Sequence, residues 1–105
     1  MKRIKRRYLL LEYEVDGAIE EHAFMDTIWA AFYKLYGEHG ASLANLAPIN
    51  FDCGDKKAII RTNLAVVDNI RTAIASITFL AGKPIAVHVT AVSGTIRGLI
   101  KKALS

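Results

Sequence analysis

Apolar and polar residues alternate along two segments of the chain, with the period of two that is typical of strands with one buried face. In residues 7–15 the apolar face consists of Leu9, Leu11, Tyr13 and Val15. In the segment that begins at Pro84 the apolar face consists of Ile85, Val87, Val89 and Ala91. Two shorter apolar runs, 49–53 and 58–62, flank Gly54-Asp55-Lys56-Lys57 and therefore predict a β-hairpin.

Apolar residues recur every three or four positions in two longer segments, as they do in amphipathic helices. The first stripe consists of Met25, Ile28, Trp29, Phe32, Leu35 and Tyr36. The second stripe consists of Val66, Val67, Ile70, Ala73, Ile74, Ile77 and Leu80. We expect the first helix to end at Gly37, and the second to have Asn63 as its N-cap and Gly82 as its left-handed stop. Ser93 is a good N-cap for a third helix that runs to about Leu104.

The order of elements is therefore β-α-β-β-α-β followed by a third helix. This order predicts an α/β (α+β) fold of the ferredoxin-like type, which RNA-recognition domains share: an antiparallel four-stranded sheet with two helices on one face. With 105 residues, of which 52% are hydrophobic and 23% charged, the chain can form one domain over residues 1–105. The same fold hosts small-ligand sensors and small hydrolases, so the fold alone leaves the function open.

Basic and acidic residues are segregated along the chain. Residues 1–11 hold five basic and no acidic residues, residues 12–55 hold nine acidic residues and only Lys34 as a base, and residues 56–105 hold eight basic residues and only Asp68 as an acid. The net charge is only +4, yet this pattern permits one strongly positive surface. Such a surface suits a protein that faces a polyanion; the alternative is a solvated surface with no partner.

The composition excludes several other classes. The uncharged runs 72–82 and 84–96 are shorter than the about 20 residues that cross a bilayer, so we expect no membrane contact. The N-terminal apolar run is interrupted by acidic residues before any cleavage site, which argues against export. Cys53 is the only cysteine, so an internal disulfide and a multi-cysteine zinc site are excluded, and the cytoplasm is the expected compartment.

No set of residues stands out as catalytic. Glu12 and Glu14 share a strand face, but no further carboxylates nearby complete an octahedral magnesium site. His22, His39 and His88 lack zinc-ligand spacing. We expect His88 to be a partly buried structural histidine; the alternative is that it meets RNA or the third helix on the side opposite the core face. The protein alone is therefore expected to be non-catalytic.

The segment Ser93-Gly94-Thr95-Ile96-Arg97 joins a strand to a helix. Backbone N–H groups at a helix start can receive a phosphate, and Arg97 could extend such an anion site. Helix capping by Ser93 and Thr95 is the alternative. The run 58–62 lacks the aromatic residues with which RNA-recognition motifs stack bases, so stacking from that strand is not expected.

Four segments together resemble one family. They are Arg7-Tyr8-Leu9-Leu10, Gly37-Glu38-His39-Gly40-Ala41, Ile59-Ile60-Arg61 and Val92-Ser93-Gly94-Thr95-Ile96-Arg97. The chain is similar over residues 6–104 to the small RNA-binding protein subunits of archaeal and eukaryotic ribonuclease P, the archaeal ribonuclease P protein component 2 family. The run Gly94-Thr95-Ile96-Arg97 after the last strand is the most specific part of this resemblance.

The resemblance implies a protein that binds and stabilises a catalytic RNA, which removes the 5′ leader from precursor tRNA. It implies a larger TIM-barrel-like protein subunit as a second partner and allows a homodimer within a heterotetramer. It also implies that Mg²⁺ belongs to the RNA and that the protein binds no cofactor. An archaeal source is favoured, because eukaryotic relatives can carry an acidic extension.

Arg7, Arg61 and Arg97 fall on basic positions of the family and are the leading candidates for RNA contact. The full set of RNA-binding candidates is Lys2, Arg3, Lys5, Arg6, Arg7, Lys56, Lys57, Arg61, Ser93, Gly94, Thr95, Arg97, Lys101 and Lys102. On the second face of the sheet, Tyr8 and Leu10 are expected to offer apolar surface to a protein partner. The rival hypotheses are a ferredoxin-like ligand-sensing or oligomerisation module and a small phosphohydrolase, for which Asn50 and Asn63 are nominal candidates.

Overall fold

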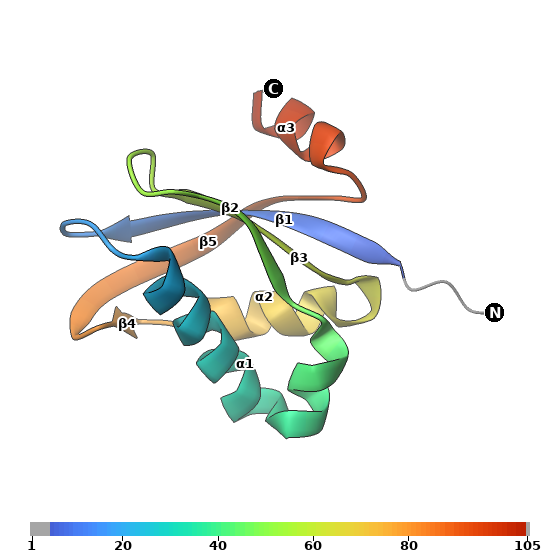
Figure 1. Cartoon of the computed structure of the whole chain (residues 1–105), viewed down its shortest axis with the longest axis horizontal. Coiled ribbons are helices and arrows are strands. Elements are labelled where there is room, and N and C mark those ends of the chain that lie inside the picture. The colour runs from blue at the N-terminus through green and yellow to red at the C-terminus, as the bar shows by residue number, and fades with distance from the viewer. Residues whose placement is uncertain (1–4, 105) are drawn as a thin grey trace.

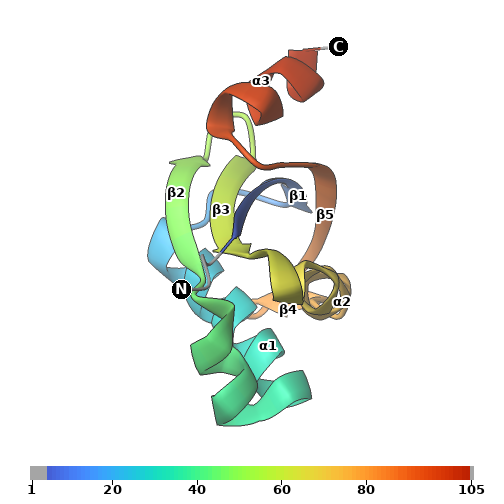
Figure 2. The ribbon, with the colours of Figure 1, turned by 90° about the vertical axis from the view of Figure 1, so that its right-hand side faces the viewer.

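The computed structural model describes residues 5–104, without the side chains of 39–44 and 103–104. The elements are β1 (Arg6–Val15), α1 (Glu21–Ala44), β2 (Ala47–Asp52), β3 (Lys57–Asn63), a 3-10 turn (Leu64–Val66), α2 (Val67–Ala75), β4 (Phe79–Leu80), β5 (Lys83–Ser93) and α3 (Ile96–Leu104). The strands form one antiparallel sheet in the order β2-β3-β1-β5-β4 (Figure 2). The predicted β-α-β-β-α-β domain with an added C-terminal helix is confirmed, and β4 is a short fifth strand that the sequence did not predict.

Helices α1 and α2 cover one face of the sheet and α3 lies against the other (Figure 1). The predicted apolar face of β1 is confirmed, since Leu9, Leu11, Tyr13 and Val15 are all buried. From α1, Phe24, Ile28 and Phe32 are buried against it. Burial of this alternating face fixes which side of β1 meets the helices, because a shift by one residue would turn every apolar side chain to the other face.

The second face of the sheet is less exposed than the sequence suggests. Leu99 of α3 is fully buried, and the helix contacts both β1 and β5. Leu10 is only 8% exposed and Tyr8 is half-buried. The expectation that Leu10 offers free apolar surface is therefore wrong, because α3 packs on this face.

Both predicted helix ends differ from the structure. At Gly37 the backbone is non-helical, with φ of 75°, but the chain resumes a helix and ends it at Ala44, so Gly37 marks a kink within α1. Leu35, placed in the apolar stripe, is 47% exposed. α2 ends at Ala75, well before Gly82, which forms the two-residue turn between β4 and β5 together with Ala81.

The second helix was predicted too long because buried apolar residues continue beyond the end of α2. Ile77 and Leu80 are buried, as the stripe predicts, but they lie in the connection to β4 and in β4 itself. At the start, the 3-10 turn separates Asn63 from α2, so Asn63 is not the N-cap of the α-helix.

A bulge changes the faces of β5. Leu11 lies opposite Val89 but Leu10 lies opposite Ala91, so Thr90 is the extra residue. Its hydroxyl donates to the Leu10 carbonyl at 3.2 Å. Beyond the bulge Val92 replaces Ala91 on the core face, which corrects the predicted alternation.

Among the described residues, no helix is long and apolar enough to cross a membrane.

Tyr13 carries an unsatisfied polar atom in the core, which leads to the first prediction. Its hydroxyl is buried and has no hydrogen-bond partner, while its ring lies 5.1 Å from that of Phe24 and 5.8 Å from that of Phe51. Burial raises the pKa of the Tyr13 phenol above its ordinary value of 10.0, and the nearby Cys53 and Asp52 raise it further by smaller amounts. We expect Tyr13→Phe to leave the free energy of unfolding unchanged or to raise it by up to about 1 kcal/mol in urea titrations.

The same substitution also changes the pH dependence. An unfolded tyrosine ionises near pH 10 and the folded one ionises later, so folding stability falls as the pH rises from there towards the raised folded value. The variant should lack this part of the alkaline loss. A large destabilisation at neutral pH would show that the hydroxyl has a partner after all.

Leu99 and Ile100 provide a second test, since they are neighbours on α3 but are 0% and 50% exposed. Leu99→Ala should lower the free energy of unfolding by about 2–5 kcal/mol, because it removes the side chain that holds α3 on the sheet. Ile100→Ala should cost less than about 1 kcal/mol. Equal effects of the two substitutions in chemical denaturation would contradict this packing.

Candidate nucleic-acid interface

Three segments that are far apart in the sequence meet at one end of the sheet. Tyr8 of β1 lies opposite Arg61 of β3 on one side and opposite Ser93 of β5 on the other. Residues directly opposite each other in antiparallel strands point to the same face. Arg61, Tyr8 and Ser93 therefore form a row across the face on which α3 lies.

The start of β1 brings further cations to the same end of the sheet. The Leu64 N–H donates to the Lys5 carbonyl at 2.8 Å, which holds the beginning of β1 beside the end of β3. The guanidinium of Arg7 donates to the Arg6 carbonyl at 2.9 Å, and a β-carbon at Gly94 would lie 3.4 Å from Arg7 Nη1, so Gly94 lies beside this side chain. We call this region the basic end; it consists of Lys5, Arg6, Arg7, Arg61, Ser93, Gly94, Thr95 and Arg97, at the right-hand end of the sheet in Figure 1.

The cations of the basic end are available to an external anion. Within the described part of the chain, the two ion pairs between side chains join His22 to Asp26 and Lys57 to Glu12, away from this region. The Nε atom of Arg61 is buried and has no hydrogen-bond partner. A buried donor without a partner is costly, so this Nε is an unsatisfied group of the protein, and an external phosphate would have to bind the other guanidinium nitrogens of Arg61.

Helix α3 begins from a capped turn next to Arg7. The Gly98 N–H donates to Thr95 Oγ1 at 3.0 Å, which makes Thr95 the N-cap. The predicted N-cap, Ser93, lies two residues earlier and accepts a long hydrogen bond of 3.4 Å from the Thr95 N–H. A β-carbon at Gly98 would lie only 2.5 Å from Ser93 Oγ, so a glycine at this position lets α3 approach the end of β5.

The structure separates Lys56 and Lys57 from the basic end, but not Lys102, whose Nζ donates to the carbonyl of Val92, the neighbour of Ser93. Lys56 and Lys57 lie at the hairpin turn, at the opposite end of β1: Lys56 Nζ donates to the Val15 carbonyl at 2.6 Å, and Lys57 Nζ lies 3.6 Å from Glu12 Oε1. Lys56 and Lys57 therefore form contacts within the protein and do not belong to the basic end. Lys101 and Lys102 lie in the last turn of α3 and are exposed. Lys2 and Arg3 lie outside the described residues.

The candidate catalytic residues do not assemble into a site. Glu12 pairs with Lys57, and His88 lies opposite Glu12 in the sheet. The prediction that His88 is partly buried is wrong, because its side of β5 is exposed at this point. Across the described residues, no three histidine, cysteine, aspartate or glutamate side chains lie close enough together to hold a metal ion.

The sequence did not predict that Tyr8 lies at the basic end. Its alternation phase correctly puts it on the second face, but only the register places it between Arg61 and Ser93. A half-buried aromatic ring beside arginines is suited to stacking on a nucleotide base. Tyr8 of β1 is therefore a candidate for the stacking role that the run 58–62, which has no aromatic residue, cannot fill.

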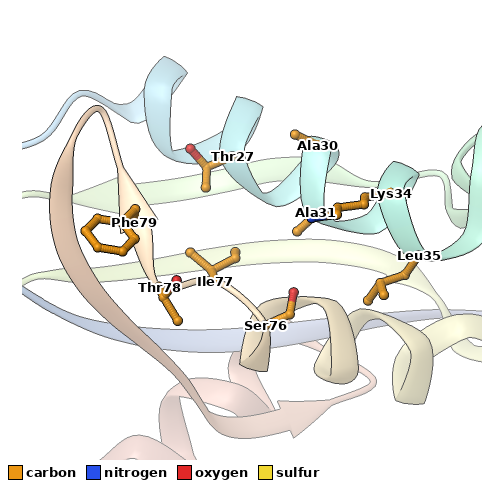
Figure 3. A pocket seen from close by; sticks show the side chains of 9 residues that line it. All are labelled: Thr27, Ala30, Ala31, Lys34, Leu35, Ser76, Ile77, Thr78 and Phe79. Atoms are coloured by element: carbon orange, nitrogen blue, oxygen red, sulfur yellow. The ribbon is translucent and has the colours of Figure 1, made fainter.

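A groove lies elsewhere, between α1 and the segment that follows α2, and has a volume of about 370 Å³ (Figure 3). Phe79 (63% exposed) and Leu35 (47% exposed) contribute most of its open apolar surface. The hydroxyls of Thr27 and Ser76 donate to backbone carbonyls, so they are not directed at a ligand. The other polar residues of the lining are Lys34 and Thr78, so the groove has few polar groups that could orient a small polar ligand.

Comparison with known proteins adds the following findings. The sequence pattern of the Rpp14/Pop5 family matches residues 7–104. Ribonuclease P protein component 2 of Pyrococcus abyssi is 34% identical over 98% of this chain and 87% of its own length. The protein of that name from Natronomonas pharaonis is 34% identical over 91% of this chain, which spans only 62% of that relative. A chain in the cryo-EM structure of yeast ribonuclease MRP has a TM-score of 0.73 at 20% identity, covering 99% of this chain and 92% of that one, which supports the fold.

The contact between Gly98 and Ser93 gives a prediction for the basic end. Alanine stabilises a helix by about 1 kcal/mol relative to glycine. A β-carbon at Gly98, however, would displace the Ser93 hydroxyl. Gly98→Ala should therefore be more favourable by about 1 kcal/mol or more in a Ser93→Ala background than in the wild type. Urea denaturation of the four proteins of this double-mutant cycle measures the difference, and additive effects would contradict the close contact.

Proposed function

The chain belongs to the Rpp14/Pop5 family, and from this premise we propose that it is a protein subunit of ribonuclease P that binds and stabilises the catalytic RNA. The catalytic RNA would remove the 5′ leader from precursor tRNA. The family resemblance implies this reaction, and the relatives named ribonuclease P protein component 2 support it. The family assignment confirms the resemblance inferred from the four sequence segments.

The observation that carries this proposal is the basic end. Arg7, Arg61 and Arg97 reach it from β1, β3 and α3, so no single segment would present the same surface. Cations at fixed positions on a sheet can neutralise phosphates of a folded RNA and release its counterions. Because the backbone of β1, β3 and β5 sets the spacing, the protein would favour one geometry of the RNA backbone and would not read base sequence in a duplex.

The proposal includes the partners and the chemistry of the assembly. We propose that a larger TIM-barrel-like protein subunit binds this chain and that two such pairs can join through a homodimer into a heterotetramer. The Mg²⁺ ions of the reaction would be bound by the RNA, with no cofactor on the protein. An archaeal cytoplasm is the proposed setting, supported by relatives from Pyrococcus and Natronomonas.

The alternative of a ligand-sensing or oligomerisation module finds no specific support. The groove of Figure 3 is lined mainly by apolar side chains, with Lys34 as its one charged residue, and that hypothesis gives no reason for three arginines at one end of the sheet. The phosphohydrolase alternative requires a positioned water or metal. Asn50 lies in β2 and Asn63 at the end of β3, so the two nominal candidates come from different strands and do not form a pair.

Substitution of arginines at the basic end tests the proposal. Arg61→Ala and Arg97→Ala should each weaken binding to the catalytic RNA and reduce the slope of log affinity against log salt concentration by about 0.7–0.9 for each lost phosphate contact. Lys83→Ala is the matched control, because Lys83 is an exposed cation at the far end of the sheet. Filter-binding titrations at several salt concentrations measure both quantities.

Cleavage assays complete this experiment. Precursor tRNA should be cut in the reconstituted particle, less efficiently with either arginine variant, and not by RNA-free protein. An unchanged salt slope in both folded arginine variants, or an equal loss in Lys83→Ala, would place RNA binding elsewhere. Circular dichroism and thermal melting verify that the variants are folded.

A further inference from the structure

One edge of the sheet is open along most of β5. Within the described residues β4 pairs with β5 only at Lys83 and Pro84, and β5 is otherwise the outer strand on this side (Figure 2). The Ile85 N–H donates to the Thr78 carbonyl at 3.0 Å, so it points away from β1. The period of two then directs the N–H and C=O groups of Val87 and Val89 outward as well.

A groove runs along this open edge. Two adjoining hollows of about 300 Å³ and 280 Å³ share Arg71 and Val89 in their walls. One continues along α2, past Ile74 and Ala75, and the other continues to Lys102 of α3. Because α2 and α3 lie on opposite faces of the sheet, they form the two sides of a channel whose floor is the edge of β5 (Figure 1).

Both sides of the channel carry a positive charge. Lys102 Nζ donates to the Val92 carbonyl at 2.5 Å, which places its ammonium group at one end of the open edge. Arg71 is exposed on α2, and within the described residues it forms no ion pair, although Asp68 lies one turn earlier on the same helix. His88 is an exposed neighbour on the strand itself.

The chemistry of the channel favours one kind of occupant. A second copy of this chain paired antiparallel through the middle of β5 would bring Arg71 of each copy towards its counterpart, and like charges at an edge oppose such pairing. The backbone of RNA offers phosphate acceptors and 2′-hydroxyl donors, but not in the alternating order and spacing of the outward N–H and C=O groups of Val87 and Val89. An extended polypeptide offers alternating donors and acceptors, and its acidic side chains would pair with the two cations.

We propose that the open edge of β5 binds an extended acidic segment of a protein partner, which adds to the sheet as a further strand. Its backbone would exchange hydrogen bonds with Val87 and Val89. Carboxylates on adjacent positions would point to opposite faces and so reach Arg71 on one side and Lys102 on the other. This surface adjoins the basic end at Val92, but Arg71, Val87 and Val89 lie outside the basic end, and the proposal does not depend on RNA binding.

The test uses the full chain and a synthetic blocked heptapeptide, Thr-Val-Glu-Glu-Val-Glu-Thr. NMR hydrogen exchange should show the amides of Val87 and Val89 slowed at least tenfold by saturating peptide. A peptide of the same sequence with N-methyl groups on alternate residues cannot donate from one edge and should not slow them. Arg71→Ala should weaken peptide binding at least fivefold, and Arg71→Ala with Lys102→Ala should weaken it further.

Lys34→Ala, which removes a cation from α1, is the matched control and should leave peptide affinity unchanged. Arg71→Ala alone keeps the test valid if loss of Lys102 disturbs α3. The proposal is overturned if millimolar peptide gives no slowing, or if the N-methylated peptide acts equally well. It is also overturned if an oligouridylate slows these amides in place of the peptide, or if raising the protein concentration alone does so.

Discussion

β1 lies at the centre of the sheet and pairs antiparallel with β3 and β5 at the same time. Its alternating apolar face is buried beneath α1 and α2, so a slip of one residue in either ladder would expose the core face. The register that burial fixes on one face also fixes the row of Arg61, Tyr8 and Ser93 on the other. The positions of the candidate RNA contacts are therefore a consequence of core packing.

Helix α3 completes this arrangement from the opposite face. The buried side chain of Leu99 holds the helix on β1 and β5, and the Thr95 cap fixes its first turn. Gly98 allows that turn to lie against Ser93, so the segment after β5 stays beside the Arg7 guanidinium. A cationic surface assembled from secondary-structure elements in this way loses little conformational entropy when RNA binds, in contrast to a flexible basic tail.

The sequence predicts those parts of the fold whose pattern is local. The face of β1 is correct because its alternation needs no knowledge of other strands, whereas the second helix is placed too long because Ile77 and Leu80 are buried by tertiary packing. The bulge at Thr90 has no local signal and appears only when β1 and β5 are paired. A residue can be buried without being helical, and a pattern of apolar residues spaced three or four apart does not show where the helix ends.

The same distinction applies to the candidate site. Charge segregation and the family resemblance indicate Arg7, Arg61 and Arg97, but only the register brings Arg7 and Arg61 to the end of the sheet from which α3 begins with Arg97 in its first turn. Lys56 and Lys57 fit the charge argument equally well, yet an antiparallel β3 must carry its first residues to the end of β1 that is remote from Arg7. The contribution of Tyr8 was missed for the same reason, because its neighbours come from two other strands.

The central claim is that the basic end faces RNA and the hairpin turn does not. Ultraviolet cross-linking of the reconstituted ribonucleoprotein, followed by mass spectrometry of the protein, tests this claim most directly. Cross-links should fall within residues 5–8, at Arg61 and within 93–97, with Tyr8 among the strongest. Cross-links concentrated at Lys56 and Lys57, with none at the basic end, would contradict the account.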